Sequence, residues 1–183
     1  MLNLEHWLRQ FGRSGRQATK VYGLIVTQTR NRVFYTHYGV KDTVTGRYEL
    51  LVLHMAIVLA ALRNYEPVNG PLSRALVEAF VADIDDILRE LGIGDMSVPR
   101  RVKKASAGLL ERSMDYLSRL QNNDAAGLAE DLACHIGMQQ ADASAQALAK
   151  YAVMSYQQLV KTTTLPIDVD SLTFPNPAHL LDT

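Results

Sequence analysis

The side chains best suited to metal binding or nucleophilic catalysis are five histidines and one cysteine, scattered along the chain. No two histidines are three or four residues apart, the spacing that would place two ligands on one face of a helix. Cys134 precedes His135, but consecutive residues of a helix point about 100° apart, so the two do not form a nucleophile and base pair. The chain also has no phosphate-binding glycine loop and no GxSxG motif. None of these patterns therefore indicates an enzyme, a cofactor, a metal site or a small-molecule substrate.

A row of carboxylates is the next candidate. Asp83, Asp86 and Glu90 are spaced by three and four residues, which places them on one helix face. Such rows bind divalent metals in helical bundles when Glu-x-x-His motifs complete the site, and the chain contains no such motif. The three carboxylates lie opposite the apolar stripe of their helix. We interpret them as a solvated or partner-facing surface.

The most informative polar group is the basic cluster Arg100, Arg101, Lys103 and Lys104, at the start of a predicted helix. Cations there oppose the helix dipole, at a cost of roughly a few tenths of a kcal/mol each. Either the preceding acidic segment, residues 85–95, folds back to pair with these cations, or an external anion binds them. That anion would be RNA phosphate, a lipid headgroup or an acidic protein segment. Both alternatives remain open on the sequence alone.

Helices must position these groups, and the central helix contains residues 50–62, LLVLHMAIVLAAL, in which only His54 is polar. A helix that is apolar on every side is surrounded by other elements. The run is shorter than the roughly 20 apolar residues that cross a bilayer, and charged residues such as Arg47 and Arg63 flank it. We predict a buried core helix in which His54 is a neutral, hydrogen-bonded structural residue.

Apolar residues recur every three or four positions through most of the chain, which predicts an all-α, single-domain bundle of about six or seven helices. Gly12, Ser14 and Gly15 separate the first two helices, and Gly92 is expected to be a left-handed cap. Asp124 is expected to cap the sixth helix. The predicted helices cover residues 2–11, 17–32, 43–65, 71–91, 98–120, 124–136 and 142–161.

Length and composition also favour one domain. The chain has 183 residues, of which 48% are hydrophobic and 21% charged, as in an ordinary globular protein. The formal net charge is zero, but residues 1–32 and 100–119 are basic whereas 66–95 and 120–183 are acidic. Such blocks produce local fields without a bulk attraction for nucleic acid or membrane. A single cysteine cannot form an internal disulfide, which suits a reducing compartment.

We divide the chain into an N-terminal amphipathic helix (residues 1–16), a helical domain (17–162) and a proline-containing tail (163–183). The first helix has Leu and aromatic residues on one face and arginines on the other. This pattern is typical of helices that lie in a membrane interface and also of helices that dock on a core or partner. Three prolines exclude a regular helix from the tail, which we expect to be extended or partly disordered.

Two separated motifs stand out in the chain. Residues 21–59 read VYGLIVTQTRNRVFYTHYGVKDTVTGRYELLVLHMAIVL, and residues 80–104 read FVADIDDILRELGIGDMSVPRRVKK. Together they resemble the ubiquinol-cytochrome c chaperone family, over roughly residues 17–120. The residues that carry the resemblance are Tyr22, Tyr35, Tyr38, Gly39, Asp42, Gly46, Arg47 and Leu50 to His54 in the first motif, and Asp83, Asp85, Leu88, Arg89, Glu90, Gly92, Gly94, Asp95, Val98 and Lys103 in the second.

The resemblance implies an all-helical assembly factor rather than an enzyme. Mitochondrial members of the family help newly made cytochrome b into ubiquinol-cytochrome c reductase, at the inner membrane, with a small partner protein and near the ribosomal tunnel exit. The chain lacks their long targeting extension and a secretory signal, so it resembles a bacterial relative. We expect it in the cytoplasm, with a peripheral contact at the inner face of the cytoplasmic membrane through residues 1–16. The implied partners are cytochrome b or its nascent chain and a small partner protein.

The candidate partner-binding residues fall into two groups. One lies where the aromatic, turn-rich segment enters the central helix, and the other is the basic cluster. The cluster also supports an alternative function, an RNA- or ribosome-binding module whose affinity falls steeply with salt. A helical metal or haem enzyme is disfavoured by the missing ligand spacing. The candidates are Tyr35, Tyr38, Asp42, Arg47, Arg100, Arg101, Lys103 and Lys104.

Overall fold

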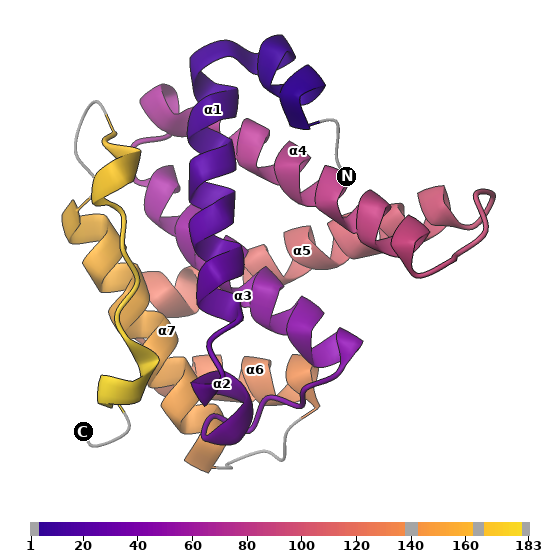
Figure 1. Cartoon of the computed structure of the whole chain (residues 1–183). Coiled ribbons are helices and arrows are strands. Elements are labelled where there is room, and N and C mark those ends of the chain that lie inside the picture. Colours follow the sequence, from indigo (N-terminus) through magenta and orange to yellow (C-terminus); the bar gives the residue numbers. More distant parts are fainter. Residues whose placement is uncertain (1–3, 138–142, 163–166, 181–183) are drawn as a thin grey trace.

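The computed structural model describes residues 4–137, 143–162 and 167–180, without the side chains of residues 1–11 and 66–67. Within these residues the chain forms seven α-helices and two 3₁₀ turns, and no strand (Figure 1). The predicted all-α fold is confirmed. The elements are α1 (Leu4–Thr29), α2 (Val33–Thr36), α3 (Val44–Arg63), α4 (Glu66–Glu90), α5 (Val98–Gln121), α6 (Ala125–Ile136), α7 (Ala143–Thr162), η1 (Val169–Ser171) and η2 (Pro177–Leu180).

Helix α3 runs through the middle of the molecule, and α1, α4, α5, α6 and α7 all pack against it (Figure 1). It starts where the Thr43 hydroxyl accepts a hydrogen bond from the Gly46 amide at 3.1 Å. By length and composition α3 could cross a membrane, but 72% of its most apolar stretch is buried inside the protein. The predicted core helix is therefore confirmed.

Three helix boundaries differ from the prediction. The N-terminal helices form one element, α1, with a kink at Gly12 (φ 56°, ψ −131°), which is where the break was expected. The second predicted helix ends at Thr29, and a short α2 follows. Helix α4 begins at Glu66, earlier than predicted, because Pro67 rather than Pro71 occupies its first turn. The amphipathic face predicted for residues 1–11 lies outside the described side chains.

The tail is extended, as predicted, but residues 167–180 also dock on the helices, which the sequence did not indicate. They run alongside α7 and contact α1 and α2 (Figure 1). The Tyr38 hydroxyl donates to the carbonyl of Pro177 at 2.9 Å, and the Gln28 amide donates to that of Pro175 at 3.1 Å. Val169 and Pro177 are buried in this contact. The tail therefore completes one side of the core.

A buried polar chain links three helices beneath this tail. His54 is fully buried, and its Nδ1 lies 2.8 Å from the Leu50 carbonyl oxygen. Because a carbonyl only accepts, Nδ1 carries the proton and Nε2 accepts from the Tyr151 hydroxyl at 2.8 Å. Tyr151 in turn accepts from the Gln28 amide at 2.9 Å. Burial lowers the pKa of His54 to about 4, so the ring is neutral at pH 7, as the sequence predicted.

A tight contact at the start of α3 gives a stability prediction. A Cβ atom at Gly46 would collide with the backbone carbonyl oxygen of Lys41. We expect Gly46→Ala to lower the free energy of unfolding by about 1–3 kcal/mol, because the backbone must move. Urea unfolding measures the change. The matched control is Gly23→Ala in α1, where a Cβ meets nothing within 4 Å; it should stabilise by up to about 1 kcal/mol. Equal effects at the two glycines would contradict the prediction.

Candidate partner-binding groove

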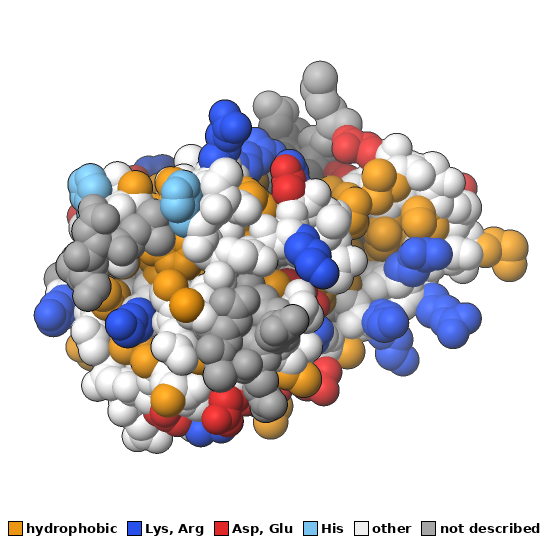
Figure 2. Space-filling view, turned by 90° about the horizontal axis from the view of Figure 1, so that it is seen from below, with side chains coloured by type: hydrophobic (Ala, Val, Ile, Leu, Met, Phe, Trp, Pro, Cys, Tyr) orange, Lys and Arg blue, Asp and Glu red, His pale blue; other side chains and the backbone are white. Residues whose placement is uncertain are grey.

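One groove, with a volume of about 1020 Å³, lies between α3, α4 and α5 and ends at α1. We call it the α3–α5 groove. Figure 2 shows that, where α4 and α5 project from the body, apolar side chains are bordered by Lys and Arg. Arg30, which follows the last residue of α1, also lines the groove. Its apolar lining is formed by Val26, Val44, Leu51, Ile84, Ile87, Leu88 and Leu91.

The first group of predicted residues meets at the rim of this groove. The Tyr35 hydroxyl donates to the Thr29 carbonyl at 2.7 Å, which fixes the ring. The Arg47 guanidinium lies over that ring, 5.7 Å from its centroid, and pairs with Asp42 at 2.6 Å. The hydrogen bond from Arg47 lowers the pKa of Asp42 below its usual value, so this exposed carboxylate stays charged. Tyr35 and Arg47 line the groove, and Asp42 orients Arg47 from outside.

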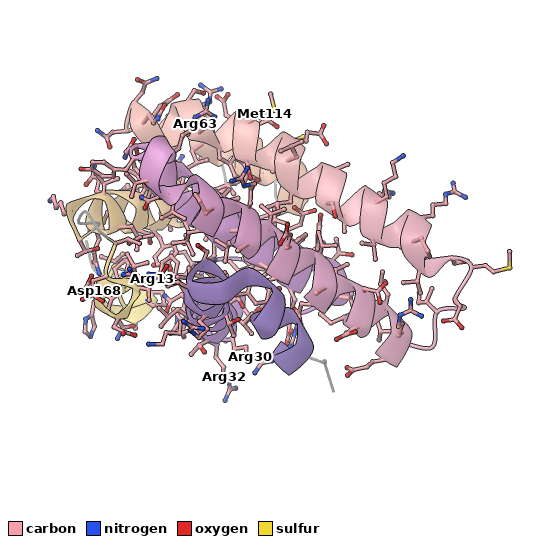
Figure 3. The ribbon with its side chains drawn as sticks, turned by 90° about the horizontal axis from the view of Figure 1, so that it is seen from above. Arg13, Arg30, Arg32, Arg63, Met114 and Asp168 are labelled. Carbon is pink, nitrogen blue, oxygen red and sulfur yellow. The ribbon has the colours of Figure 1, made fainter. Side chains whose placement is uncertain are left out.

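The basic cluster divides between two sides of α5. Arg101 and Lys104 line the groove, whereas Arg100 and Lys103 are exposed on other sides of the helix. Farther along α5, Met114 is exposed at the edge of the molecule opposite Arg30 (Figure 3). The structure thus brings half of the basic cluster to the same groove as Tyr35 and Arg47.

Tyr38 occupies a different environment from the other candidates. Its side chain is fully buried against Phe34 and Tyr151, and its hydroxyl is bonded to the tail. It holds the segment that carries Tyr35 in place and does not itself line the groove.

Internal pairing does not neutralise the basic cluster. Asp85 and Asp95, the carboxylates expected to fold back, instead pair with Arg89 at 2.5 and 2.6 Å. Within the part of the chain that the structure describes, no ion pair joins any cation of the cluster to a carboxylate. The charges of Arg101 and Lys104 therefore face the groove without an internal counter-charge in contact.

Two carboxylates of the α4 row, Asp83 and Glu90, line the opposite wall of the groove, and Asp86 does not. The row was predicted to be a solvated or partner-facing surface, and Asp83 is not freely solvated. Helix α1 packs across α4, so Asp83 is half-buried and accepts a hydrogen bond from Tyr22 at 2.8 Å. Burial raises the pKa of Asp83 above its usual value. Asp86 has one buried oxygen without a hydrogen-bond partner, and Glu90 is exposed at the rim. Among the described residues, no three His, Cys, Asp or Glu side chains are grouped as metal ligands.

An ion pair in the lining of the groove joins α3 to α5, and sequence reasoning missed it. Arg112 donates two hydrogen bonds to Glu49, at 2.6 and 2.9 Å, and the Glu49 side chain is only 5% exposed. The Tyr48 hydroxyl donates to the Ala105 carbonyl at 2.8 Å beside it. The available signal was Glu49 itself, an acid placed directly before an apolar run that must be buried. These contacts fasten α3 to α5.

Comparison with known proteins gives two matches. The family model described as ubiquinol-cytochrome C chaperone matches residues 36–165. The crystal structure of the Cbp3 homolog from Brucella abortus is similar over 97% of this chain and 98% of that chain, with 29% sequence identity and a TM-score of 0.81. None of the curated proteins matches the chain.

Proposed function

Since this chain belongs to the ubiquinol-cytochrome C chaperone family, we propose that it is a non-enzymatic assembly factor for cytochrome b and the ubiquinol-cytochrome c reductase complex. It acts by protein–protein contact, in the cytoplasm of a bacterium and peripherally at the inner face of the cytoplasmic membrane. The α3–α5 groove receives the client.

The observation that carries this proposal is that members of both predicted groups line one apolar groove: Tyr35 and Arg47 from the first, Arg101 and Lys104 from the second. A client destined for the membrane exposes apolar side chains before insertion, and an apolar groove between helices can cover them. Tyr35 supplies an aromatic contact at the rim, and Arg47, Arg101 and Lys104 supply charge. Aromatic and arginine side chains are the residue types most often dominant in protein–protein binding.

Deletion of the gene in the native organism tests the proposed function. We expect the reduced-minus-oxidised spectrum of the membranes to show a loss of b-type cytochrome, and the wild-type gene to restore it. Normal b-type cytochrome and reductase levels in the deletion strain would refute the proposed function.

Complementation with charge-reversed variants tests the groove. Arg101→Glu combined with Lys104→Glu should weaken client binding about tenfold or more, because two attractions become repulsions, and should fail to restore the cytochrome. Arg100→Glu combined with Lys103→Glu is the matched control, since it makes the same charge change on surfaces of α5 outside the groove. Circular dichroism of both purified proteins checks that they fold. If both double variants lose client binding and cytochrome restoration to the same extent, the groove assignment is contradicted.

The second candidate function is RNA or ribosome binding by the basic cluster, and the absence of ion pairs to its cations within the described residues favours it. Reversal of Arg100, Arg101, Lys103 and Lys104 together should then abolish cosedimentation with ribosomes, and added salt should weaken it steeply in the wild type. Cosedimentation that survives the reversal would remove this assignment.

A further inference from the structure

We infer that the α3–α5 groove takes an amphipathic helix of its client, with the apolar face in the groove, an acidic flank toward α5 and a basic flank toward α4. This inference rests on the proposed function, because it names the kind of segment that the same groove binds. The charges on the two walls also set the direction in which the helix lies.

The two long walls of the groove carry opposite charge. Helix α5 contributes Arg101 and Lys104 at its first turns, and these are matched by acids on a bound helix. Helix α4 contributes Asp83 and Glu90, which are matched by bases. Complementary flanks of this kind fix orientation and suppress wrong partners more than they raise affinity.

Four further charges line the groove: Arg30 after the end of α1, the paired Glu49 and Arg112, and Glu111 of α5. Arg30 acts on Asp83 from the end of α1, where it partly offsets the effect of burial on the pKa of that carboxyl. Glu111 lies farther along α5 and is 4.0 Å from Arg112. Glu49 and Arg112 neutralise each other in a doubly hydrogen-bonded pair, so the start of α5, with Arg101 and Lys104, remains the basic part of its wall.

A helix fits the groove better than an extended segment. Extended peptides gain affinity by adding a strand to a sheet edge, and the described residues contain no strand. A helix satisfies its own backbone hydrogen bonds and needs only side-chain contacts, which the apolar lining supplies. The volume of about 1020 Å³ is at the upper end of the roughly 300–1,000 Å³ range of small-molecule pockets, which suits several large side chains.

The acidic wall disfavours a polyanion inside this groove. RNA phosphates or anionic lipid headgroups near Arg101 would also approach Glu90 and Asp83, and like charges facing each other cost free energy. A segment with one acidic and one basic flank satisfies both walls at once.

Binding of synthetic peptides to the full chain tests this inference by fluorescence anisotropy. Four labelled peptides of about 15 residues share one apolar face, a length at which helices begin to be stable. The first has one acidic and one basic flank, the second two acidic flanks, the third two basic flanks, and the fourth repeats the first with a central proline. We expect the first peptide to bind at least about tenfold more tightly than the others.

Variants of the protein should change this ranking in a defined way. In the variant with Arg101→Glu and Lys104→Glu, both α4 and α5 present acids. The peptide with two basic flanks should then bind most tightly, and the ratio of its affinity to that of the first peptide should rise about tenfold or more. The Arg100→Glu and Lys103→Glu control should keep the original ranking. Glu90→Lys should shift the preference toward the peptide with two acidic flanks.

Three results would overturn the inference: equal binding of the proline peptide, a ranking that the α5 reversal leaves unchanged, or displacement of the peptide by polyuridylate RNA or by phosphatidylglycerol vesicles. These outcomes are separate from failure of the proposed function. Normal b-type cytochrome in the deletion strain would refute the proposed function, whichever peptide binds best. If the deletion strain loses the cytochrome but the charge reversal on α5 leaves the peptide ranking unchanged, only the helix assignment is refuted.

Discussion

Replacement of Arg112 by alanine (Arg112→Ala) is expected to lower the free energy of unfolding by about 3–5 kcal/mol. Glu49 accepts two hydrogen bonds from Arg112, at 2.6 and 2.9 Å, and its side chain is only 5% exposed. Without Arg112 this carboxylate stays buried and unpaired, and such a charge costs far more than the pair itself contributes. Urea unfolding at pH 7 should show a lower midpoint with an unchanged slope.

Two controls isolate the cause of this loss. The double variant Glu49→Leu with Arg112→Met removes both charges and keeps the volume, and it should recover most of the stability. Arg100→Ala, on the same helix but exposed, should change the free energy of unfolding by less than about 0.5 kcal/mol. A double variant as unstable as Arg112→Ala would show that lost packing, rather than an unpaired charge, is responsible.

Acidification is expected to destabilise the protein by about 3 kcal/mol through His54 alone. Burial lowers the pKa of His54 from 6.5 to about 4 in the folded state. Between these values the unfolded chain binds a proton that the folded chain does not, so the free energy of unfolding falls as the pH is lowered. The contribution of His54 is fully present above pH 6.5 and is lost as the pH falls toward about 4.

The measurement is urea unfolding at a series of pH values, on the wild type and on His54→Gln. The variant should be less stable at pH 7, because glutamine reproduces the bonds to Leu50 and Tyr151 imperfectly. The difference between the two proteins should then shrink as the pH falls from 7 to about 4.5, since only the wild type loses the histidine contribution. Carboxylates that titrate in both proteins cancel in this difference. A difference that does not change with pH would refute the assignment.

Features set by local sequence were predictable. The apolar run around His54 identified the buried helix, because this helix is apolar on every side rather than on one face. Asp124 caps α6 through the Gly127 amide at 2.9 Å, and Gly137 ends it with φ 73°. Gly92 has the expected left-handed conformation, with φ 73°. In each case the signal lies within a few residues of the structure it determines.

Features set by contacts between distant segments were not predictable. Asp83 was assigned to a solvated or partner-facing surface because it lies opposite the apolar stripe of its own helix, yet α1 also packs on α4 and leaves Asp83 half-buried. The candidate site shows the same limit. The first sequence motif singled out Arg47, and the basic cluster singled out Arg101. Nothing in the sequence indicated that α3 and α5 would place both on one groove, or that Arg100 would lie outside that groove.

The docking of the tail has a consequence for the order of folding during synthesis. Tyr38 and Pro177, which share a hydrogen bond, are separated by 139 positions in the chain. Contacts between distant residues form slowly, because a long loop must close before they are gained. The ring of Phe174, which packs 5.1 Å from that of His54, is translated long after α3. On the ribosome, the side of the core around Tyr38 and His54 therefore stays uncovered until residues 167–180 have emerged.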